Sequence, residues 1–423
     1  MRTTRLMTRT LTALVAAALP AALLPLTAGA SEAASTAQAE PRRVDYREFT
    51  TGAQMKAGTL RGLSARKGTL RITKPVGTTG GYEYGQWVSP WVKQGFSLTE
   101  LVPSWTATTP GDTYVRVEVR GKGPKRSTWD AITNWALDDR TVKRRSYSGQ
   151  SDDLGRVAWD TWVTSGVSSW QLRVTLMRRA GTAATPKVKA VGAMVSRVPS
   201  STGVTTSKPG VASRRGTVLP VPSYSQMAHR GYYQQYDGGG AAWCSPTSTT
   251  MVLGYYGALP PASQYRWVRK DYPDRVVAHL ARSTYDNGFG GTGNWPFNTA
   301  YAASRTGHAF VTRLRSLREA EKFVAAGIPV VTSVAFSSGQ LTGAPISSTN
   351  GHLMVVVGFK GNGDVVVNDP AAPTRSGVRR TYDRGQFEDA WLKRGSAGGS
   401  GGIAYIVHDK AHPLPAPGAK GAW

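Results

Sequence analysis

The stretch GGGAAWCSPTSTTMVLGYYG, residues 238–257, contains Cys244, the only cysteine in the 423-residue sequence. Three residues recur at four-residue spacing after the cysteine and Gly257 follows them, so the stretch predicts a helix over residues 244–256. A cysteine in the first turn of a helix lies near the positive end of the helix dipole, which favours the thiolate. Pro246 fits that turn, because its missing N–H would have no helical partner there. The local sequence therefore favours a reactive nucleophile over an inert buried thiol.

The N-terminus has the pattern of a secretory signal peptide. Three arginines precede a mostly apolar run over residues 11–26, and Ala28-Gly29-Ala30 supplies small residues of the kind found before a signal-peptidase cut. We therefore predict a signal peptide at residues 1–30 and a secreted, extracellular protein, with association to the cell wall as a further option. The other interpretation, a membrane anchor, needs about 20 apolar residues. No later stretch predicts a transmembrane segment, and a lone cysteine outside the cell is either inert or reactive.

The composition describes a globular and strongly basic protein. Hydrophobic residues make up 40% and aromatic residues 9% of the chain, which excludes a disordered protein. Lys and Arg number 52 against 26 Asp and Glu, a formal net charge of +26, and such a charge attracts polyanions. An anionic cell-wall polymer is one expected partner, although a solvated arginine-rich surface explains the charge equally well. No nucleic-acid-binding motif is present, so we expect no specific nucleic-acid partner.

Residues 44–198 predict an all-β sandwich domain. Segments such as TYVRVEVRGKG (113–123) and WQLRVTLMRR (170–179) alternate apolar and polar residues, with turn signals between them. Eight tryptophans lie in this half: Trp87, Trp91, Trp105, Trp129, Trp135, Trp159, Trp162 and Trp170. They form either its core or a carbohydrate-binding platform, and we prefer the core. Residues 199–216 are rich in Ser, Thr, Gly and Pro and are the expected linker.

Residues 217–410 mix helical and strand patterns, which predicts an α+β domain. Helices are expected over residues 244–256, within 264–282, and over 316–327 and 386–393. Ser316 and Glu319 have the spacing of a capping box. Strands are expected over residues 329–336, 352–359, 364–368 and 402–408. Residues 411–423 are expected to be a flexible tail.

A cysteine nucleophile needs a base, and His352 is the preferred candidate among the six histidines. It opens the segment GHLMVVVGFKGNGDVVVNDP, which predicts a hairpin that ends at Asp369, an acid that could orient the imidazole. A turn at Lys360-Gly361 places the two residues opposite each other, whereas the stronger turn signal Asn362-Gly363 leaves them four positions apart, roughly 13 Å. In that register a β-bulge or a non-strand start at His352 must close the gap.

The other histidines are weaker candidates. His229 lies in a polar loop near the cysteine in sequence and is the main rival base. His279 and His308 lie in helical or loop context, and His408 and His412 are four residues apart in a coil-like region. With one cysteine and no cluster of acids and histidines at ligand spacing, we expect no metal and no cofactor.

Four segments, VPSYSQ, WCSPTSTTMVLGYYG, GHLMVVVGF and VVVNDPA, resemble the papain-like cysteine peptidases, and more closely the bacteriocin-processing (double-glycine leader) peptidases and their secreted stand-alone relatives. The resemblance covers residues 217–409 and implies a papain-like α+β fold. In chain order it implies that Gln226 is the oxyanion donor, Cys244 the nucleophile, His352 the base and Asp369 its orienting acid. The chain departs from the family pattern in a long insertion between Gln226 and Cys244 and in a serine after the cysteine, where glycine is usual. The first half resembles sandwich domains that accompany such peptidases.

The sequence therefore predicts a secreted, monomeric cysteine peptidase that acts on peptide or protein substrates. A cell-wall amidase or acyltransferase of the same fold is an alternative, because the fold and the nucleophile would be shared. A further alternative is a cell-surface binding protein whose catalytic half is vestigial.

Overall fold

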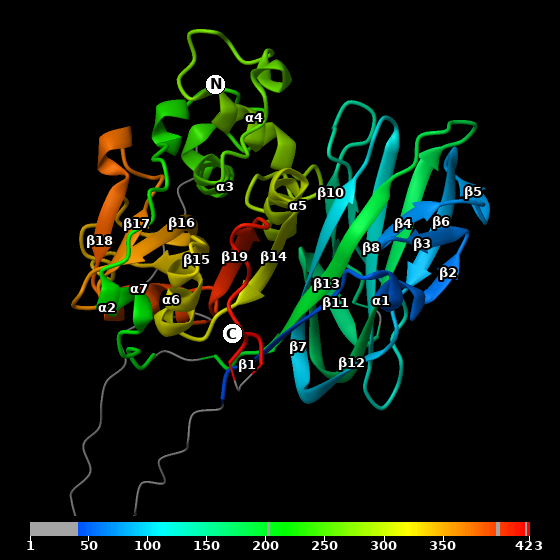
Figure 1. Ribbon diagram of the computed structural model, residues 1–423, viewed down its shortest axis with the longest axis horizontal. Coiled ribbons are helices and arrows are strands. Elements are labelled where there is room, and N and C mark those ends of the chain that lie inside the picture. Colours follow the sequence, from blue (N-terminus) through cyan, green and yellow to red (C-terminus); the bar gives the residue numbers. More distant parts are fainter. Residues whose placement is uncertain (1–40, 152, 201–203, 395–397, 419–420) are drawn as a thin grey trace, which may run out of the picture. The chain divides into compact units, whose positions relative to one another are not determined.

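The alternating segments of the first half form strands, as their pattern predicts (Figure 1). The computed structural model describes residues 41–151, 153–200, 204–394, 398–418 and 421–423, and the predicted signal peptide, residues 1–30, lies outside them. One short helix, α1 (Gly52–Lys56), accompanies the strands of this half. The strands are β1 (Arg43–Phe49), β2 (Thr59–Arg61), β3 (Leu63–Arg66), β4 (Thr69–Ile72), β5 (Gly77–Thr79), β6 (Tyr82–Val88), β7 (Val92–Thr108), β8 (Thr113–Lys122), β9 (Asp130–Trp135), β10 (Arg145–Gly149), β11 (Gly155–Trp159), β12 (Thr161–Arg179) and β13 (Lys187–Arg197).

Two long strands, β7 and β12, connect the pairing of this half. The first part of β12 pairs with β11 and β7, and its second part pairs with β8 and β6. Register shifts around Val167 mark β-bulges in the pairing with β7, and bulges bend a strand. The second part of β7, residues 100–108, pairs with β13. The structure agrees with the all-β prediction, but the strands are paired as one continuous 13-stranded sheet and not as two separate sheets of a sandwich.

The tryptophans of the first half mostly form its core, as preferred from the sequence. The buried ones are Trp87, Trp105, Trp135, Trp162 and Trp170. Trp129 and Trp159 are partly buried, and Trp91 is exposed. Indole rings of this size contribute a large buried apolar area, which supports the sheet from within.

The second half contains helices and a six-stranded antiparallel sheet with the order β14-β19-β15-β16-β17-β18. Its strands are β14 (His308–Arg313), β15 (Val330–Phe336), β16 (Thr349–Phe359), β17 (Val365–Asn368), β18 (Arg379–Tyr382) and β19 (Ile403–His408). Its helices are α2 (Val211–Arg215), α3 (Cys244–Tyr255), α4 (Arg275–Thr284), α5 (Trp295–Thr306), α6 (Leu317–Ala325) and α7 (Arg384–Leu392), with 3-10 turns η1 (Gln226–His229), η2 (Gly240–Ala242), η3 (Ala262–Tyr265) and η4 (Arg375–Gly377). None of the helices in the described residues is both long and apolar enough to cross a membrane.

Most elements expected in this half have a counterpart. The predicted helices correspond to α3, α4, α6 and α7, and the predicted strands correspond to β15, β16, β17 and β19. The sequence patterns did not predict α2, α5, β14 or β18. The prediction of a capping box is wrong, because the Ser316 side chain makes no cap hydrogen bond. Glu319 instead forms an ion pair with Arg315 (2.7 Å).

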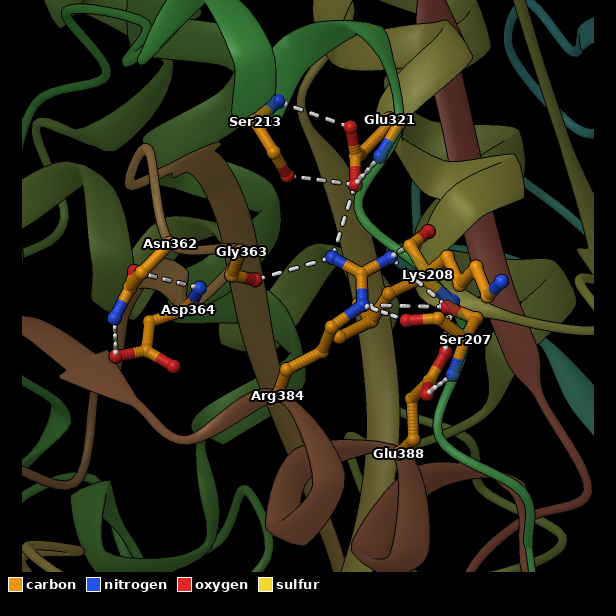
Figure 2. Close-up of polar contacts among 11 residues, drawn as sticks. Ser207, Lys208, Ser213, Glu321, Asn362, Gly363, Asp364, Arg384 and Glu388 are labelled. Atoms are coloured by element: carbon orange, nitrogen blue, oxygen red, sulfur yellow. Dashed lines mark hydrogen bonds and ion pairs between the residues drawn. The ribbon is translucent and has the colours of Figure 1, made fainter.

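The predicted linker lies against α6 and α7 (Figure 2). The backbone N–H and hydroxyl of Ser207 both donate to the Glu388 carboxylate at 2.6 Å. In α2, the backbone N–H and the hydroxyl of Ser213 donate to the Glu321 carboxylate (2.9 and 2.8 Å). Arg384 joins the two groups, because its guanidinium donates to Glu321 (2.9 Å) and to the Ser207 carbonyl (2.6 Å). This network therefore anchors the connecting segment to the second half.

Aromatic side chains from the two halves pack into one core. Phe297 of α5 is fully buried, with its ring centroid 5.2 Å from that of Trp135 and 6.4 Å from that of Trp105. Phe310 of β14 stacks on Tyr46 of β1 at 4.2 Å. The buried residues of both halves consequently belong to the same hydrophobic cluster.

Buried polar contacts also join the two halves. Asp286 accepts hydrogen bonds from the backbone N–H and the hydroxyl of Ser146. Arg313 of β14 forms a buried ion pair with Glu100 of β7 at 2.8 Å. Residues 41–423 accordingly form a single compact unit.

The C-terminal residues also differ from the expectation of a flexible tail. Trp423 is only 7% exposed, and its ring lies 5.3 Å from that of Phe310 and 5.2 Å from that of Phe323. Its carbonyl accepts a hydrogen bond from Arg315 (2.7 Å). The described part of the tail is therefore fixed by packing, because its large aromatic residue completes the shared core.

Replacing Phe297 by alanine tests whether the halves share a core. We expect Phe297→Ala to lower the free energy of unfolding by about 3–5 kcal/mol, because it leaves a cavity between the two tryptophans. Both halves should still unfold in one transition, at a lower temperature. The control is Val76→Ala at a side chain that is 47% exposed, where a change within about 0.5 kcal/mol is expected. Calorimetry that shows two transitions, with only one of them shifted, would contradict the shared core.

Candidate active site

Cys244 is the first residue of α3, and its side chain is partly buried. Trp243 precedes it, and the buried indole Nε1 donates to the Tyr236 carbonyl (2.7 Å), which fixes the backbone before the cysteine. The approach to the helix requires glycine, because a Cβ at Gly240 would lie 2.5 Å from the Gln226 carbonyl oxygen. The first N–H groups of the helix lack intrahelical partners, so they are available to an anionic group at the cysteine.

The structure brings His352 and Asp369 together at the open end of the β16–β17 hairpin. His352 Nε2 lies 2.8 Å from Asp369 Oδ1, and both side chains are buried. A β-bulge between Val356 and Gly358 shifts the strand register. Beyond the bulge, Val355 pairs with Asn368. His352 and Asp369 are therefore offset by two positions along the hairpin, and their side chains span this offset. A bulge is one of the two ways in which the sequence analysis expects the gap between His352 and Asp369 to be closed.

Electrostatic contacts keep His352 protonated. Burial by itself lowers the pKa of His352, but the Asp369 carboxylate and the Cys244 thiol raise it to about 10. Burial also favours the neutral form of Asp369, yet the contact with His352 holds the pKa of that carboxyl below its ordinary value. Because Nε2 is used by Asp369, Nδ1 is the ring nitrogen available to the thiol. The arrangement is thus an imidazolium held between a carboxylate and a thiol.

Two further groups hold Asp369 in place. The Tyr382 hydroxyl donates to Asp369 Oδ2 (2.8 Å), and the Ala371 N–H donates to Oδ1 (3.0 Å). Sequence reasoning missed Tyr382 because it missed β18. The strand-favouring pair Thr381-Tyr382 is the signal that could have found this strand.

Gln226 lies beside the glycine-rich approach to the cysteine and is 3% exposed. Its Nε2 donates to the Ala241 carbonyl (2.6 Å), and its backbone N–H donates to the Pro370 carbonyl (2.9 Å). Gln226 therefore connects the segment before Cys244 with the segment after Asp369. The inserted residues between Gln226 and Cys244 fold as η1, η2 and their connecting turns, so the insertion does not separate the two in space.

The rival base His229 is not part of this group. Its ring is fully buried and lies between those of Trp243 and Tyr272, with centroids 5.7 and 5.1 Å away. Burial lowers the pKa of His229 to about 4, so it is uncharged at neutral pH. Its two ring nitrogens have no hydrogen-bond partner among the described residues. It therefore has neither the carboxylate partner nor the charge that His352 has.

The remaining histidines are bound elsewhere. His308 lies between His408 and Glu48, with both contacts at 2.8 Å, and His412 pairs with Asp409 at 2.7 Å. His279 approaches the Ser283 hydroxyl at 3.4 Å. Among the residues that the structure describes, no group of three His, Cys, Asp or Glu side chains is arranged to hold a metal ion.

A cleft of about 500 Å³ opens at Cys244. Its walls come from the segment before α5, the end of β15, the start of β16 and the β11–β12 turn of the first half. A second cavity of about 610 Å³, lined by residues such as Arg144 and Arg282, contains none of the four predicted site residues. The cleft at Cys244 is thus where a substrate can reach the thiol.

Solved structures that resemble parts of the chain do so distantly. They include TmCBM61 in complex with β-1,4-galactotriose, with 10% identity, a TM-score of 0.17, and coverage of 36% of this chain and 88% of that one. A family two carbohydrate esterase from Cellvibrio japonicus has 9% identity and a TM-score of 0.20, with 42% of each chain covered. The Agl-KA catalytic domain has 9% identity and a TM-score of 0.17, with 44% of this chain and 33% of that one covered. Such low scores carry no functional argument, and no curated protein matches the chain.

Family comparisons match both halves. The family described as "Peptidase C39 N-terminal domain" matches residues 45–196, which contain most of the all-β half. The family described as "Peptidase_C39 like family" matches residues 218–398, which contain Gln226, Cys244, His352 and Asp369. The order of the two matches is the order of the two halves in the structure. The chain therefore belongs to the C39 family of cysteine peptidases.

Proposed function

We propose that the chain is an active peptidase of papain-like arrangement that hydrolyses peptide bonds through Cys244, His352 and Asp369. The observation that carries the proposal is the buried His352–Asp369 pair, with Nε2 and Oδ1 2.8 Å apart, next to a cysteine at a helix N-terminus that opens into a cleft.

The proposed reaction uses the proton on His352 twice. The Cys244 thiolate attacks the substrate carbonyl carbon, and the C=O π electrons move to the oxygen. When the tetrahedral intermediate collapses, the C–N bond breaks and His352 gives its proton to the leaving amine. A water molecule then attacks the thioester and loses its proton to His352, which restores the free thiolate and releases the carboxylate product. Asp369 holds the imidazole in position and stabilises its charge during both steps.

We further propose that Gln226 and the backbone N–H of Cys244 bind the oxyanion. Gln226 is a neutral donor, so it stabilises negative charge without exchanging protons with His352. One N–H of its amide is used by the Ala241 carbonyl, which orients the side chain and leaves the second N–H for a substrate. The contact between η1 and η2 supports this placement beside the cysteine.

We also propose that the protein acts outside the cell. The support is the pattern of residues 1–30, which is read from the sequence. Sequencing the N-terminus of protein from culture medium checks this, since an intact Met1 there would rule out signal-peptide cleavage.

The first prediction for the site concerns Cys244 and His352 as a unit. On a peptide substrate found by library digestion, Cys244→Ala and His352→Ala should each remove nearly all turnover, and the double variant should lose little more. The matched control is His279→Ala, which also replaces a largely buried histidine but lies outside the site. Full activity of Cys244→Ala would refute the proposal. Activity on cell-wall amides but on no peptide would favour the amidase alternative.

The second prediction concerns the oxyanion. Gln226→Ala should lower kcat about 10²–10³-fold, the usual cost of losing one oxyanion donor. Alkylation of Cys244 by iodoacetamide should continue at a similar rate, because alkylation creates no oxyanion. Gln234→Ala is the control, since this exposed glutamine bonds only its own turn at the Gly231 carbonyl. If kcat of Gln226→Ala stays within about threefold of the wild-type value, the oxyanion donor is another group.

A further inference from the structure

The catalytic cleft is not built by the second half alone. Trp159 and Asp160, the turn between β11 and β12 of the first half, line the same cleft as Cys244. Asp160 Oδ2 accepts a hydrogen bond from the Trp295 N–H at the start of α5 (3.2 Å), which fixes the turn against the second half. We propose that this turn forms a substrate subsite that selects a positively charged Lys or Arg side chain, a specificity that rests on the peptidase function proposed above.

The backbone of this turn favours a functional role for its side chains. Ala158 and Thr161 are paired, so Trp159 and Asp160 are the two central residues of a tight hairpin. Trp159 has φ = 58°, a left-handed conformation that such hairpins usually fill with Gly or Asn. A bulky residue in that conformation is strained, and strain of this kind concentrates at ligand-binding sites. The hairpin backbone does not require a tryptophan here, whereas the cleft uses its ring as a wall.

Trp159 forms this wall together with Phe289 of the second half. Their ring centroids are 5.4 Å apart in an edge-to-face arrangement, and Phe289 is 51% exposed. A large exposed aromatic ring at the mouth of a cleft suits an aliphatic stem or a cationic group of a bound ligand. The two rings come from different halves, so the wall exists only when the halves are packed together.

Asp160 supplies the charge of the subsite. Among the lining residues that the structure describes, the only charged side chains are Asp160 and Asp237, in a chain whose net charge is +26. Asp237 of the second half accepts hydrogen bonds from the Thr292 backbone N–H and hydroxyl, both at Oδ2 (2.8 and 3.0 Å), and its charge adds to that of Asp160. Asp160 accepts only neutral donors, from Trp295 and Thr161, and forms no ion pair within the described residues.

Neighbouring charged groups leave Asp160 available for a cation. Burial, and to a smaller extent the charge of Asp286, raise the pKa of Asp160 to about 6. Arg313 also acts on it, but Arg313 is already paired with Glu100, and the other titratable group nearby, Tyr405, stays neutral. Asp160 is therefore ionised at pH 8 as a partly buried charge without an ion-pair partner among the described residues, and a bound Lys or Arg side chain would supply that partner.

Digestion of a peptide library by the full chain tests the substrate preference. Wild-type protein should favour Lys or Arg at one position near the cleaved bond, with about 10-fold higher kcat/KM than for a matched peptide with norleucine there. Asp160→Asn keeps the shape of the side chain and should bring this ratio to about one, while norleucine peptides are still cleaved. Asp271→Asn, an exposed change of the same charge outside the cleft, should leave the ratio unchanged.

A second variant separates the wall from the fold. Trp159→Gly should remain folded, because glycine is unstrained at this φ and the relief of strain offsets part of the lost contact with Phe289. It should raise KM for every peptide with a long side chain at the selected position, since the aromatic wall is gone. An unchanged KM would mean that Trp159 does not contact substrate.

Reaction of Cys244 with small thiol reagents tests the charge without any turnover. Because the chain has one cysteine, labelling reports this site alone. A cationic and an anionic methanethiosulfonate (trimethylammonium-ethyl and sulfonato-ethyl) react with Cys244 in the same way, each forming its own mixed disulfide and releasing methanesulfinate, so the ratio of their rates reports the local charge. At about pH 8, Asp160→Asn should lower the cationic-to-anionic ratio at least about threefold, and Asp271→Asn should not.

The two experiments distinguish the subsite from the peptidase function. If no peptide is cleaved but Asp160→Asn changes the reagent ratio, the cation subsite stands and the proposed peptidase function fails. If peptides are cleaved without a preference that depends on Asp160, and the reagent ratio does not change, the subsite is overturned and the peptidase function stands.

Discussion

The buried contact between His352 and Asp369 is the constraint on which the site depends. Neither side chain could be charged at that depth without the other, because burial opposes both charged forms. The bulge in β16 and the hydrogen bond from Tyr382 bring the carboxylate into reach and hold it there. The consequence is an imidazolium beside the sulfur of Cys244, and a positive charge in that position is what a thiolate nucleophile needs.

The second constraint is the packing of the two halves around Phe297 and the tryptophans next to it. This core places the β11–β12 turn of the first half at the mouth of the catalytic cleft. An accessory domain on a loose linker could not hold Trp159 and Asp160 near Cys244. The segment that connects the halves is also held in place, because Ser207 forms hydrogen bonds with Glu388 and Arg384. The all-β half is therefore part of the substrate-binding structure in this account.

Local signals in the sequence predicted much of the framework and the order of the site residues. The helix at Cys244 and the hairpin from His352 to Asp369 follow from spacing and turn residues close together in the chain. The bulge at Gly358 could not be placed, because two turn registers fitted the same pattern. Helix α5 was missed although Asn294 caps it and Pro296 lies in its first turn, because its buried residues other than Phe297 and Tyr301 are mostly small or polar and do not form a clear apolar stripe. The position of Asp160 at the cleft depends on contacts about 85–135 residues away, which no local pattern reports.

Titration of the His352 side chain by NMR tests the central claim most directly. With the histidine ring nitrogens labelled and His352→Gln used for assignment, the account predicts that this imidazole stays protonated through neutral pH and titrates near its raised pKa of about 10. Asp369→Asn should move that titration to lower pH, because the carboxylate is the main cause that raises it. A wild-type His352 that titrates near the ordinary histidine pKa of about 6.5 would contradict the account, since the proposed charged pair would then not exist at neutral pH.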